Sequence, residues 1–412
     1  MSGFETKAIH EGATPDAATG AVALPLYESA AFAYPTAEGL ASVFAGKEFG
    51  YVYSRIANPT VTAFERKMTA LEEGFGSLAV SSGMAAIATA VFALAIPGDE
   101  IVASKSLFGG TLSFFNGLVK RQGIVTVYVD ATDIAAYAAA VTERTRLIFV
   151  ETIGNPKLDV PDIASIANVA RAHNVPLVVD GTLSTPYLFK AKDAGAALVI
   201  HSATKYITGN GTAIGGVIVD CGTYDWGKSP NATLRTSAAK AGASAFLSVA
   251  RKEIVTNTGN CLSPLNAFLH YLGLETLALR MERHCGNAQL LADHLSRHSK
   301  VTSVNYPGLA SNPDHNVADR QFNGRFGGVV TVTLGTSDAA RACINNLRLA
   351  KNLANVGDAK TLVIHPASTI YRDTPAEEMR TAGVSDDMIR VSVGIETIDD
   401  IIADFDAALT KV

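Results

Sequence analysis

The chain has 412 residues, of which 48% are apolar, so it can bury a large core and is neither a disordered nor a fibrous protein. Its 34 Lys and Arg against 39 Asp and Glu give a net charge of −5 without charge blocks, which argues against a nucleic-acid partner. The four cysteines are far apart in sequence and form no CxxC pair, so neither a disulfide scaffold nor a metal site is expected.

The N-terminal segment and the apolar stretches give no sign of a membrane partner. Residues 1–20 carry acids and no apolar run, which predicts neither a secretory signal nor a transit peptide. The apolar stretch 84–96 is shorter than the roughly 18 residues that a membrane span needs, and we interpret it as a buried helix. We therefore expect a cytoplasmic protein.

The order of elements predicts an α/β fold. Residues 1–58 have mixed polarity and no long periodic element, as in an arm that packs on another part. From Ser77 onward, short apolar runs alternate with helix-sized intervals, which predicts a mostly parallel seven-stranded sheet with helices on both faces. The runs are SLAV at 77, EIVA at 100, VTVYV at 125, RLIFVE at 146, PLVVD at 176, ALVIHS at 197 and GGVIVD at 215.

The pattern changes near Leu262. A long helical stretch over 264–295 is followed by fewer strands, at 329–334 and 389–393, and by a helix near 399–409. These elements predict a smaller C-terminal α+β domain. We therefore divide the chain into an arm (1–58), a large domain (59–261) and a C-terminal domain (262–412).

The segment HSATK at 201–205 directly follows a predicted strand. A lysine at the end of a buried strand must be paired, have a lowered pKa, or be tied up covalently as an imine. Ser202 and Thr204 place hydroxyls beside Lys205, which suits a phosphate, so the segment suggests a phosphorylated aldehyde cofactor. The alternative interpretation is a solvent-exposed lysine in a loop.

Two further strand ends, taken together with Lys205, strengthen the interpretation of a phosphorylated aldehyde cofactor. Asp180 ends the run PLVVD and could pair with a protonated pyridine nitrogen, although aspartate there is also a common helix cap. Ser82, Gly83 and Met84 lead from a strand into a helix whose free N–H groups offer an anion site, although a plain capped helix has the same pattern. The glycine-rich segment 209–215 precedes a strand, so it does not predict a dinucleotide site.

Several motifs of the sequence resemble those of a known family. SSGMAA at 81, VVD with STPYL from 178, HSATKY at 201, YSRIANPT at 53 and IRVSVGIE at 389 resemble the Cys/Met-metabolism family of pyridoxal-phosphate enzymes, which has the PLP-dependent transferase fold type I. The likeness extends from about residue 6 to 409. Within the family, GNGTAIGGVIVD at 209, YPGLASNPDH at 306, LANVGDAKTLVIHPAS at 353 and AGVSDDMIRVSVGIETIDDIIAD at 382 resemble the O-acetylhomoserine sulfhydrylase branch.

The resemblance implies a role for each matching residue. Lys205 would bind the aldehyde of pyridoxal 5'-phosphate and then move protons, and Asp180 would hold the pyridinium. The remaining cofactor-binding residues would be Ser82, Gly83, Met84, Phe108, Ser202 and Thr204, joined by Tyr53 and Arg55 from a neighbouring subunit. Arg390, Asn355 and Asn155 would hold the substrate carboxylate. The protein would be a homo-oligomer, a tetramer built from dimers with shared sites.

Two departures from the family pattern concern the site. Phe108, which we count with Lys205 and Asp180 as a catalytic residue, stands where the family usually places a tyrosine over the ring. It can stack on the ring but has no hydroxyl to move a proton, which looks more like the O-succinylhomoserine sulfhydrylases. Gly181 stands where an asparagine commonly follows the aspartate, which would enlarge the pocket or loosen the hydrogen bonds of the ring. Gly110 and Asn355 replace the cysteine and the serine of the methionine γ-lyases.

The implied reaction is γ-substitution on O-acetyl-L-homoserine, or its O-succinyl analogue, by sulfide or methanethiol. The product would be homocysteine or methionine. The alternatives are a cystathionine γ-synthase-like enzyme or another γ-substitution with a different nucleophile, a methionine γ-lyase-like elimination, and a catalytically silent homologue.

Overall fold

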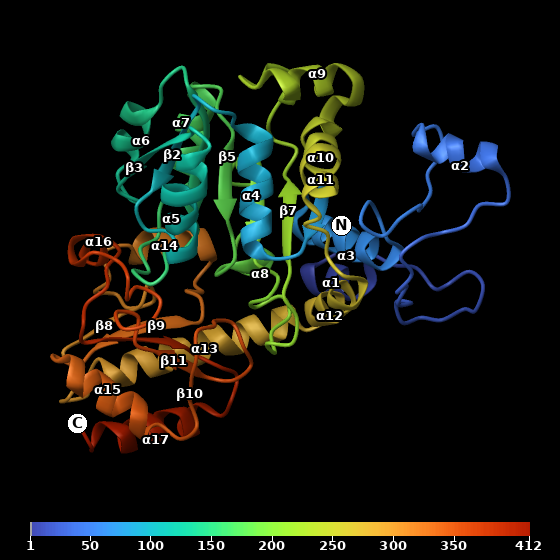
Figure 1. The fold of residues 1–412 in the computed structure, drawn as a ribbon. Coiled ribbons are helices and arrows are strands. Elements are labelled where there is room, and N and C mark those ends of the chain that lie inside the picture. Colours follow the sequence, from blue (N-terminus) through green and yellow to red (C-terminus); the bar gives the residue numbers. More distant parts are fainter. Residues whose placement is uncertain (1) are drawn as a thin grey trace.

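Residues 2–412 are described by a computed structural model, the side chain of Glu378 excepted. They form a large sheet flanked by helices, followed by a smaller sheet near the C-terminus (Figure 1). The expected α/β class with a second, smaller α+β part is therefore confirmed. No helix in the described part of the chain is long and apolar enough to cross a membrane.

The large sheet has seven strands in the order β1-β7-β6-β5-β4-β2-β3. All neighbours are parallel except β7, which runs antiparallel to both β1 and β6. Each of the seven runs predicted from the sequence forms one of its strands. They are β1 (Gly76–Val80), β2 (Glu100–Ser104), β3 (Val125–Val129), β4 (Thr145–Glu151), β5 (Leu177–Asp180), β6 (Leu198–His201) and β7 (Gly216–Asp220).

Alternating strand residues feed two separate cores, one on each face of this sheet. Val150 and Val179 pack with α3 (Pro59–Glu72) and α7 (Ile163–Ala172) on one face. Phe149 and Val178 pack with α4 (Gly83–Leu94) and α10 (Ala245–Val249) on the other. Because side chains alternate along a strand, the continuous apolar runs follow from burial on both faces. The helix expected over 84–96 is α4.

The other helices connect the strands or extend the layers. In the large part these are α5 (Gly109–Phe114), α6 (Ile134–Ala140), α8 (Thr185–Leu188), α9 (Ala232–Ala241) and α11 (Thr256–Thr258), with π-helical turns at Phe115–Val119 and Ala250–Val255 and 3₁₀ turns at Trp226–Lys228 and Gly242–Ser244.

The C-terminal part has a five-stranded sheet in the order β10-β11-β12-β9-β8. The two predicted strands are β9 (Val329–Thr333) and β12 (Met388–Ser392), which are antiparallel neighbours. Three shorter strands, not expected from the sequence, complete the sheet, and the helix predicted near 399–409 is α17. The remaining elements are β8 (Ser303–Asn305), β10 (Lys351–Asn352), β11 (Leu362–Ile364), α14 (His315–Phe322), α15 (Ser337–Asn346), α16 (Ala376–Thr381) and α17 (Ile398–Leu409).

The single helix expected over 264–295 is two helices. The chain bends at Thr276, between α12 (Pro264–Glu275) and α13 (Leu277–Leu295). The two helices have different neighbours, since α12 packs on α3 and α13 packs on β9 and α17. The apolar pattern does not show the bend, because both helices bury an apolar face. The boundary at residue 261 between the large domain and the C-terminal domain remains a prediction.

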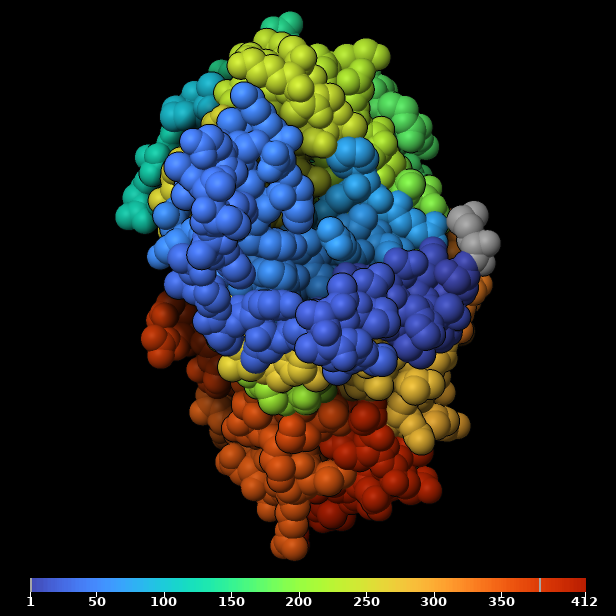
Figure 2. Space-filling model, turned by 90° about the vertical axis from the view of Figure 1, so that its right-hand side faces the viewer, coloured from blue at the N-terminus to red at the C-terminus, as the bar shows by residue number. Residues whose placement is uncertain are grey.

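The N-terminal residues form an extended arm. It contains α1 (Phe4–His10), which packs on α3, and α2 (Ala37–Phe44), which projects from the body in Figure 1. Figure 2 shows these blue residues spread over one side of the molecule. Val22, Phe44 and Phe49 in the arm are 85%, 69% and 78% exposed, which is unusual for large apolar side chains.

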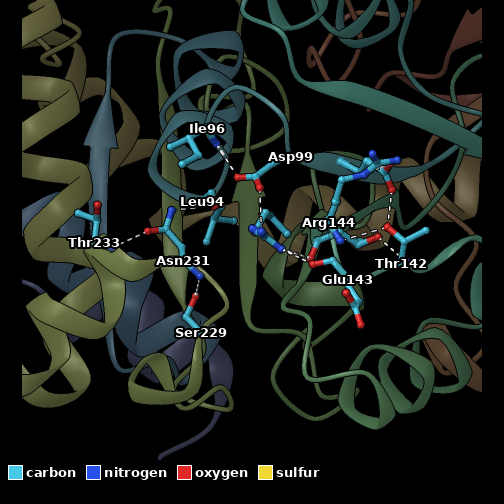
Figure 3. A network of polar contacts seen from close by, with 12 residues as sticks. Leu94, Ile96, Asp99, Thr142, Glu143, Arg144, Ser229, Asn231 and Thr233 are labelled. Atoms are coloured by element: carbon cyan, nitrogen blue, oxygen red, sulfur yellow. Dashed lines mark hydrogen bonds and ion pairs between the residues drawn. The ribbon is translucent and has the colours of Figure 1, made fainter.

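A polar network closes the edge where the parallel strands begin (Figure 3). The amide of Asn231 donates to the carbonyl of Leu94, and its Oδ1 accepts from the N–H of Thr233 at the start of α9. Asp99 accepts from the N–H of Ile96 at 2.9 Å. These bonds satisfy the end of one helix and the start of another.

A close contact joins the start of α4 to the end of β6. A Cβ atom on Gly83 would lie 2.6 Å from the Cβ of Ser202, so no larger residue fits without a shift of the backbone. We predict that Gly83→Ala lowers the stability of the apoprotein by about 1–3 kcal/mol, the usual range for overpacking. The measurement is the midpoint of thermal unfolding.

Gly286 in α13 is the matched control, because a Cβ atom there meets nothing within 4 Å. Gly286→Ala is expected to leave the midpoint unchanged or to raise it by the equivalent of up to about 1 kcal/mol, through higher helix propensity. An equal effect of the two substitutions would contradict the contact argument.

Candidate functional site

A cavity of about 340 Å³ lies at the carboxyl ends of the parallel strands. Ligands of open α/β sheets collect at this edge, because loops from several strands meet there. The cavity brings together all of the predicted site residues except Tyr53 and Arg55. These lining residues are Ser82, Gly83, Met84, Phe108, Asn155, Asp180, Ser202, Thr204, Lys205, Asn355 and Arg390.

The amine of Lys205 is held at one side of the cavity. Its Nζ donates a hydrogen bond of 2.6 Å to Oδ1 of Asn355. Burial, helped by the positive charge of Arg390, lowers the pKa of Lys205 to about 8. The neutral, nucleophilic form of this amine is therefore accessible much closer to neutral pH than that of an ordinary lysine.

The carboxylate of Asp180 lies at the end of β5. Its Oδ1 accepts a hydrogen bond of 2.9 Å from the N–H of Thr182. Burial raises the pKa of Asp180, while the bonds from Thr182 and the charge of His201 oppose this rise. A cation bound against the carboxylate would favour its ionised form, which suits a protonated ring nitrogen.

The start of α4 offers an anion site. Ser82 caps the helix by accepting a hydrogen bond of 3.0 Å from the N–H of Ala85. The N–H groups of the first helical turn have no partner within the helix, and the positive end of its dipole is at the cavity. Ser202 and Thr204 line the same end. A phosphate fits this set of donors.

Arg390 comes from the other sheet. It lies in β12, is only 4% exposed, and donates from Nη1 to Oδ1 of Asn155 at 3.0 Å and from Nη2 to the carbonyl of Asn355 at 3.2 Å. Burial lowers its pKa to about 10. A guanidinium held in this way is a planar donor fork for a carboxylate.

Tyr53 and Arg55 do not line the cavity of their own chain. The guanidinium of Arg55 lies 5.4 Å from the centre of the Tyr53 ring and donates to the carbonyl of Thr256 at 2.6 Å. Both residues are at the base of the arm, and Tyr53 is 44% exposed. Their expected reach into a neighbouring subunit stays a prediction.

Glu151 was missed by the sequence reasoning. It ends β4 and is the register partner of Asp180. It lines the cavity and accepts a hydrogen bond of 2.6 Å from the N–H of Phe108. Burial and the neighbouring Asp180 raise the pKa of Glu151 well above its ordinary value. The signal was available, because RLIFVE ends in a carboxylate just as PLVVD does.

Gly181 does not border the cavity, contrary to the expectation that it would enlarge the pocket. A Cβ atom on it would point to the opposite face and lie 2.7 Å from Cε1 of His201. Side chains alternate along a strand, so Asp180 faces the cavity and its neighbour faces away. Among the described residues, no group of His, Cys, Asp and Glu is arranged to hold a metal ion.

The residues fit pyridoxal 5'-phosphate by their chemistry. The anion site at α4 suits the phosphate, the neutral amine of Lys205 suits the aldehyde, and the carboxylate of Asp180 suits the ring nitrogen. Phe108 supplies an aromatic ring at the same cavity.

Comparison with known proteins agrees with this site. A family model described as Cys/Met metabolism PLP-dependent enzyme matches residues 5–410. The homocysteine synthase of Schizosaccharomyces pombe is 44% identical over 419 residues, which cover 98% of each chain. The O-acetyl-L-homoserine sulfhydrylase of Corynebacterium glutamicum is 41% identical and covers 100% of this chain and 97% of its own.

The solved structures include a similar protein with its cofactor. A Campylobacter jejuni protein described as an O-acetylhomoserine (thiol)-lyase carries a pyridoxyl-lysine phosphate and superimposes with a TM-score of 0.93. It is 32% identical, and the match covers 99% of this chain and 100% of that one. The fold is therefore the PLP-dependent fold type I. The chain belongs to the Cys/Met-metabolism family of pyridoxal-phosphate-dependent enzymes.

Proposed function

We propose that this enzyme catalyses γ-substitution on O-acetyl-L-homoserine by sulfide or methanethiol, giving homocysteine or methionine. The observation that carries the proposal is the buried set of Lys205, Asp180 and Arg390 in one cavity. The names of relatives that are 41% and 44% identical over nearly the whole chain support the choice of donor and product.

The cofactor would be held at three points. Lys205 holds the aldehyde, Asp180 faces the ring nitrogen, and the start of α4 with Ser202 and Thr204 holds the phosphate. Pyridoxal phosphate, when bound, supplies an electron sink for negative charge that develops on the substrate carbon atoms. Phe108 packs on the face of the ring.

Arg390 orients the amino-acid end of the substrate. Its guanidinium binds the carboxylate as a fork, and its bonds to Asn155 and to the carbonyl of Asn355 fix the plane of that fork. The cavity excludes much of the water, which strengthens this charged contact. The substrate is thereby held with its reacting carbon atoms toward Lys205.

Lys205 moves the protons. The amino group of the substrate would displace Lys205 from the aldehyde and so free its amine. The amine would take the proton from the α carbon, give it up to the electron sink and, neutral again, take a proton from the β carbon, after which the acyl group would leave from the γ carbon as a carboxylate. The sulfur nucleophile adds to that carbon, and Lys205 returns the protons in the reverse order. One flexible side chain can reach several carbon atoms, and a pKa of about 8 permits both uptake and release of protons. Phe108 has no hydroxyl and takes no part in these transfers.

We propose that the site is completed by a second subunit. The exposed arm would place Tyr53 and Arg55 of one chain at the phosphate end of the neighbouring cavity, and two such dimers would form the tetramer. The exposed apolar side chains of the arm support this assembly, since they have no cover within one chain.

The products formed from O-acetylhomoserine test the reaction. In the presence of sulfide we expect homocysteine as the product. With cysteine we expect little cystathionine, and without any thiol we expect no 2-oxobutyrate. Lys205→Ala is expected to abolish turnover and to keep the fold, because it removes the group that moves the protons. Chromatography of the products checks this, with O-succinylhomoserine as the competing donor. Cystathionine or 2-oxobutyrate as the main product would point to a synthase or a lyase instead.

Mixed oligomers test the shared site. Arg55→Ala and Lys205→Ala chains are each expected to be inactive, and their equal mixture to regain about a quarter of the wild-type activity, because half the dimers are mixed and hold one intact site. The control mixture is Asp180→Asn with Lys205→Ala, in which no site is intact. The shared-site proposal fails if the two mixtures behave alike.

The pH dependence of cofactor incorporation tests the burial of Lys205. The neutral amine is the reactive form, so the rate at which the apoprotein takes up pyridoxal phosphate should rise with pH around a midpoint near 8. Arg390→Gln removes a neighbouring positive charge and should move the midpoint to higher pH. Stopped-flow absorbance gives both rates, with free lysine as the reference. A midpoint near the ordinary value of 10.5 would contradict the desolvation argument.

A further inference from the structure

A buried pair of ionisable groups lies directly behind the site. Oε1 of Glu72, the last residue of α3, is 2.6 Å from Nε2 of His201, the last residue of β6. The side chains are 0% and 1% exposed, and neither lines the cavity. Burying such a pair costs several kcal/mol of desolvation per ion, so a well-packed apolar pair would serve stability at least as well. Stability alone therefore does not account for this pair.

The imidazole of His201 lies against the backbone that carries Asp180. The N–H of Gly181 donates to the carbonyl of Ile200 at 2.9 Å, which places the ends of β5 and β6 side by side. A Cβ atom on Gly181 would be 2.7 Å from Cε1 and 3.3 Å from Nδ1 of His201. This contact explains why glycine follows Asp180 here, because any side chain at position 181 would displace the ring.

Other ionisable groups lie near Glu72. They include Lys190, whose Nζ donates to the carbonyl of Leu71, and the thiol of Cys221. The charge of His201 is among the influences that favour the ionised form of Asp180. Nδ1 of His201 has no hydrogen-bond partner in the described part of the chain.

We propose that Glu72 and His201 are positioning residues that hold the end of β5 in place, so that the carboxylate of Asp180 faces the ring nitrogen of the cofactor. The pair acts through the sheet, from α3 to β6 and from β6 to β5, and touches neither substrate nor cofactor. The contact with Glu72 fixes the plane of the imidazole against Gly181. The inference rests on the proposed role of Asp180 and is independent of the nucleophile and of the acyl group.

A double-mutant cycle on cofactor affinity tests the positioning role of Glu72 and His201. Glu72→Gln and His201→Gln keep the approximate size of each side chain and replace each ionisable group by a neutral amide. We expect each to weaken the binding of pyridoxal phosphate to the apoprotein about tenfold when Asp180 is present, and less than about twofold in the Asp180→Asn background. Equilibrium dialysis with absorbance detection gives the dissociation constants without any turnover measurement.

Glu65→Gln is the matched control. Glu65 lies two turns earlier on the same helix, is also buried, and pairs with Arg251 at 2.8 Å. Its loss should leave cofactor affinity within about twofold in both backgrounds, because none of the contacts described for Glu65 reaches His201 or Asp180. Both Glu72 and His201 are substituted, so if one variant fails to fold, the other still tests the proposal.

Three results would overturn the proposal that Glu72 and His201 position Asp180. The first is an equal loss of affinity with and without Asp180, which would make the pair a purely structural one. The second is a loss in Glu65→Gln as large as that in Glu72→Gln. The third is Asp180→Asn binding the cofactor as well as the wild type, which would remove the role of Asp180 itself. A failure of the γ-substitution assay would leave the cycle unaffected, so the two proposals fail separately.

Discussion

The desolvation of three charged groups in one cavity governs the site. Burial raises the pKa of Asp180 and lowers those of Lys205 and Arg390, so each charged form is disfavoured until a ligand of complementary charge is bound. A cationic ring nitrogen and a carboxylate would supply the complementary charges for Asp180 and Arg390, and an aldehyde would react with the neutral amine of Lys205.

The site also depends on the contact between the two sheets. Asp180 and Lys205 follow strands of the large sheet, whereas Arg390 belongs to β12 of the small one. The bonds of Arg390 to Asn155 and to the carbonyl of Asn355 cross this boundary, and Lys205 reaches the side chain of Asn355. Any shift between the two parts would therefore separate the carboxylate fork from the reactive amine, with a large effect on rate.

The fold and the core of the site could be predicted because their signals are local. Each strand of the large sheet is buried on both faces and reads as a continuous apolar run, and the polar residues that end these runs meet at one edge. The bend at Thr276 and the short strands β8, β10 and β11 were not predicted, because they depend on neighbours far away in the sequence. Glu151 carried the same signal as Asp180 and was overlooked.

The sequence by itself determined the order of elements and the family resemblance, and it predicted Lys205, Asp180 and Arg390 as the groups that carry the chemistry. Only the tertiary structure decided how these groups affect one another. It shows the hydrogen bond from Lys205 to Asn355, the side of the sheet on which Gly181 lies, and the pairing of Glu72 with His201. These contacts join residues separated by up to 150 positions. Such contacts follow from the packing of layers, and no local pattern of residues encodes them.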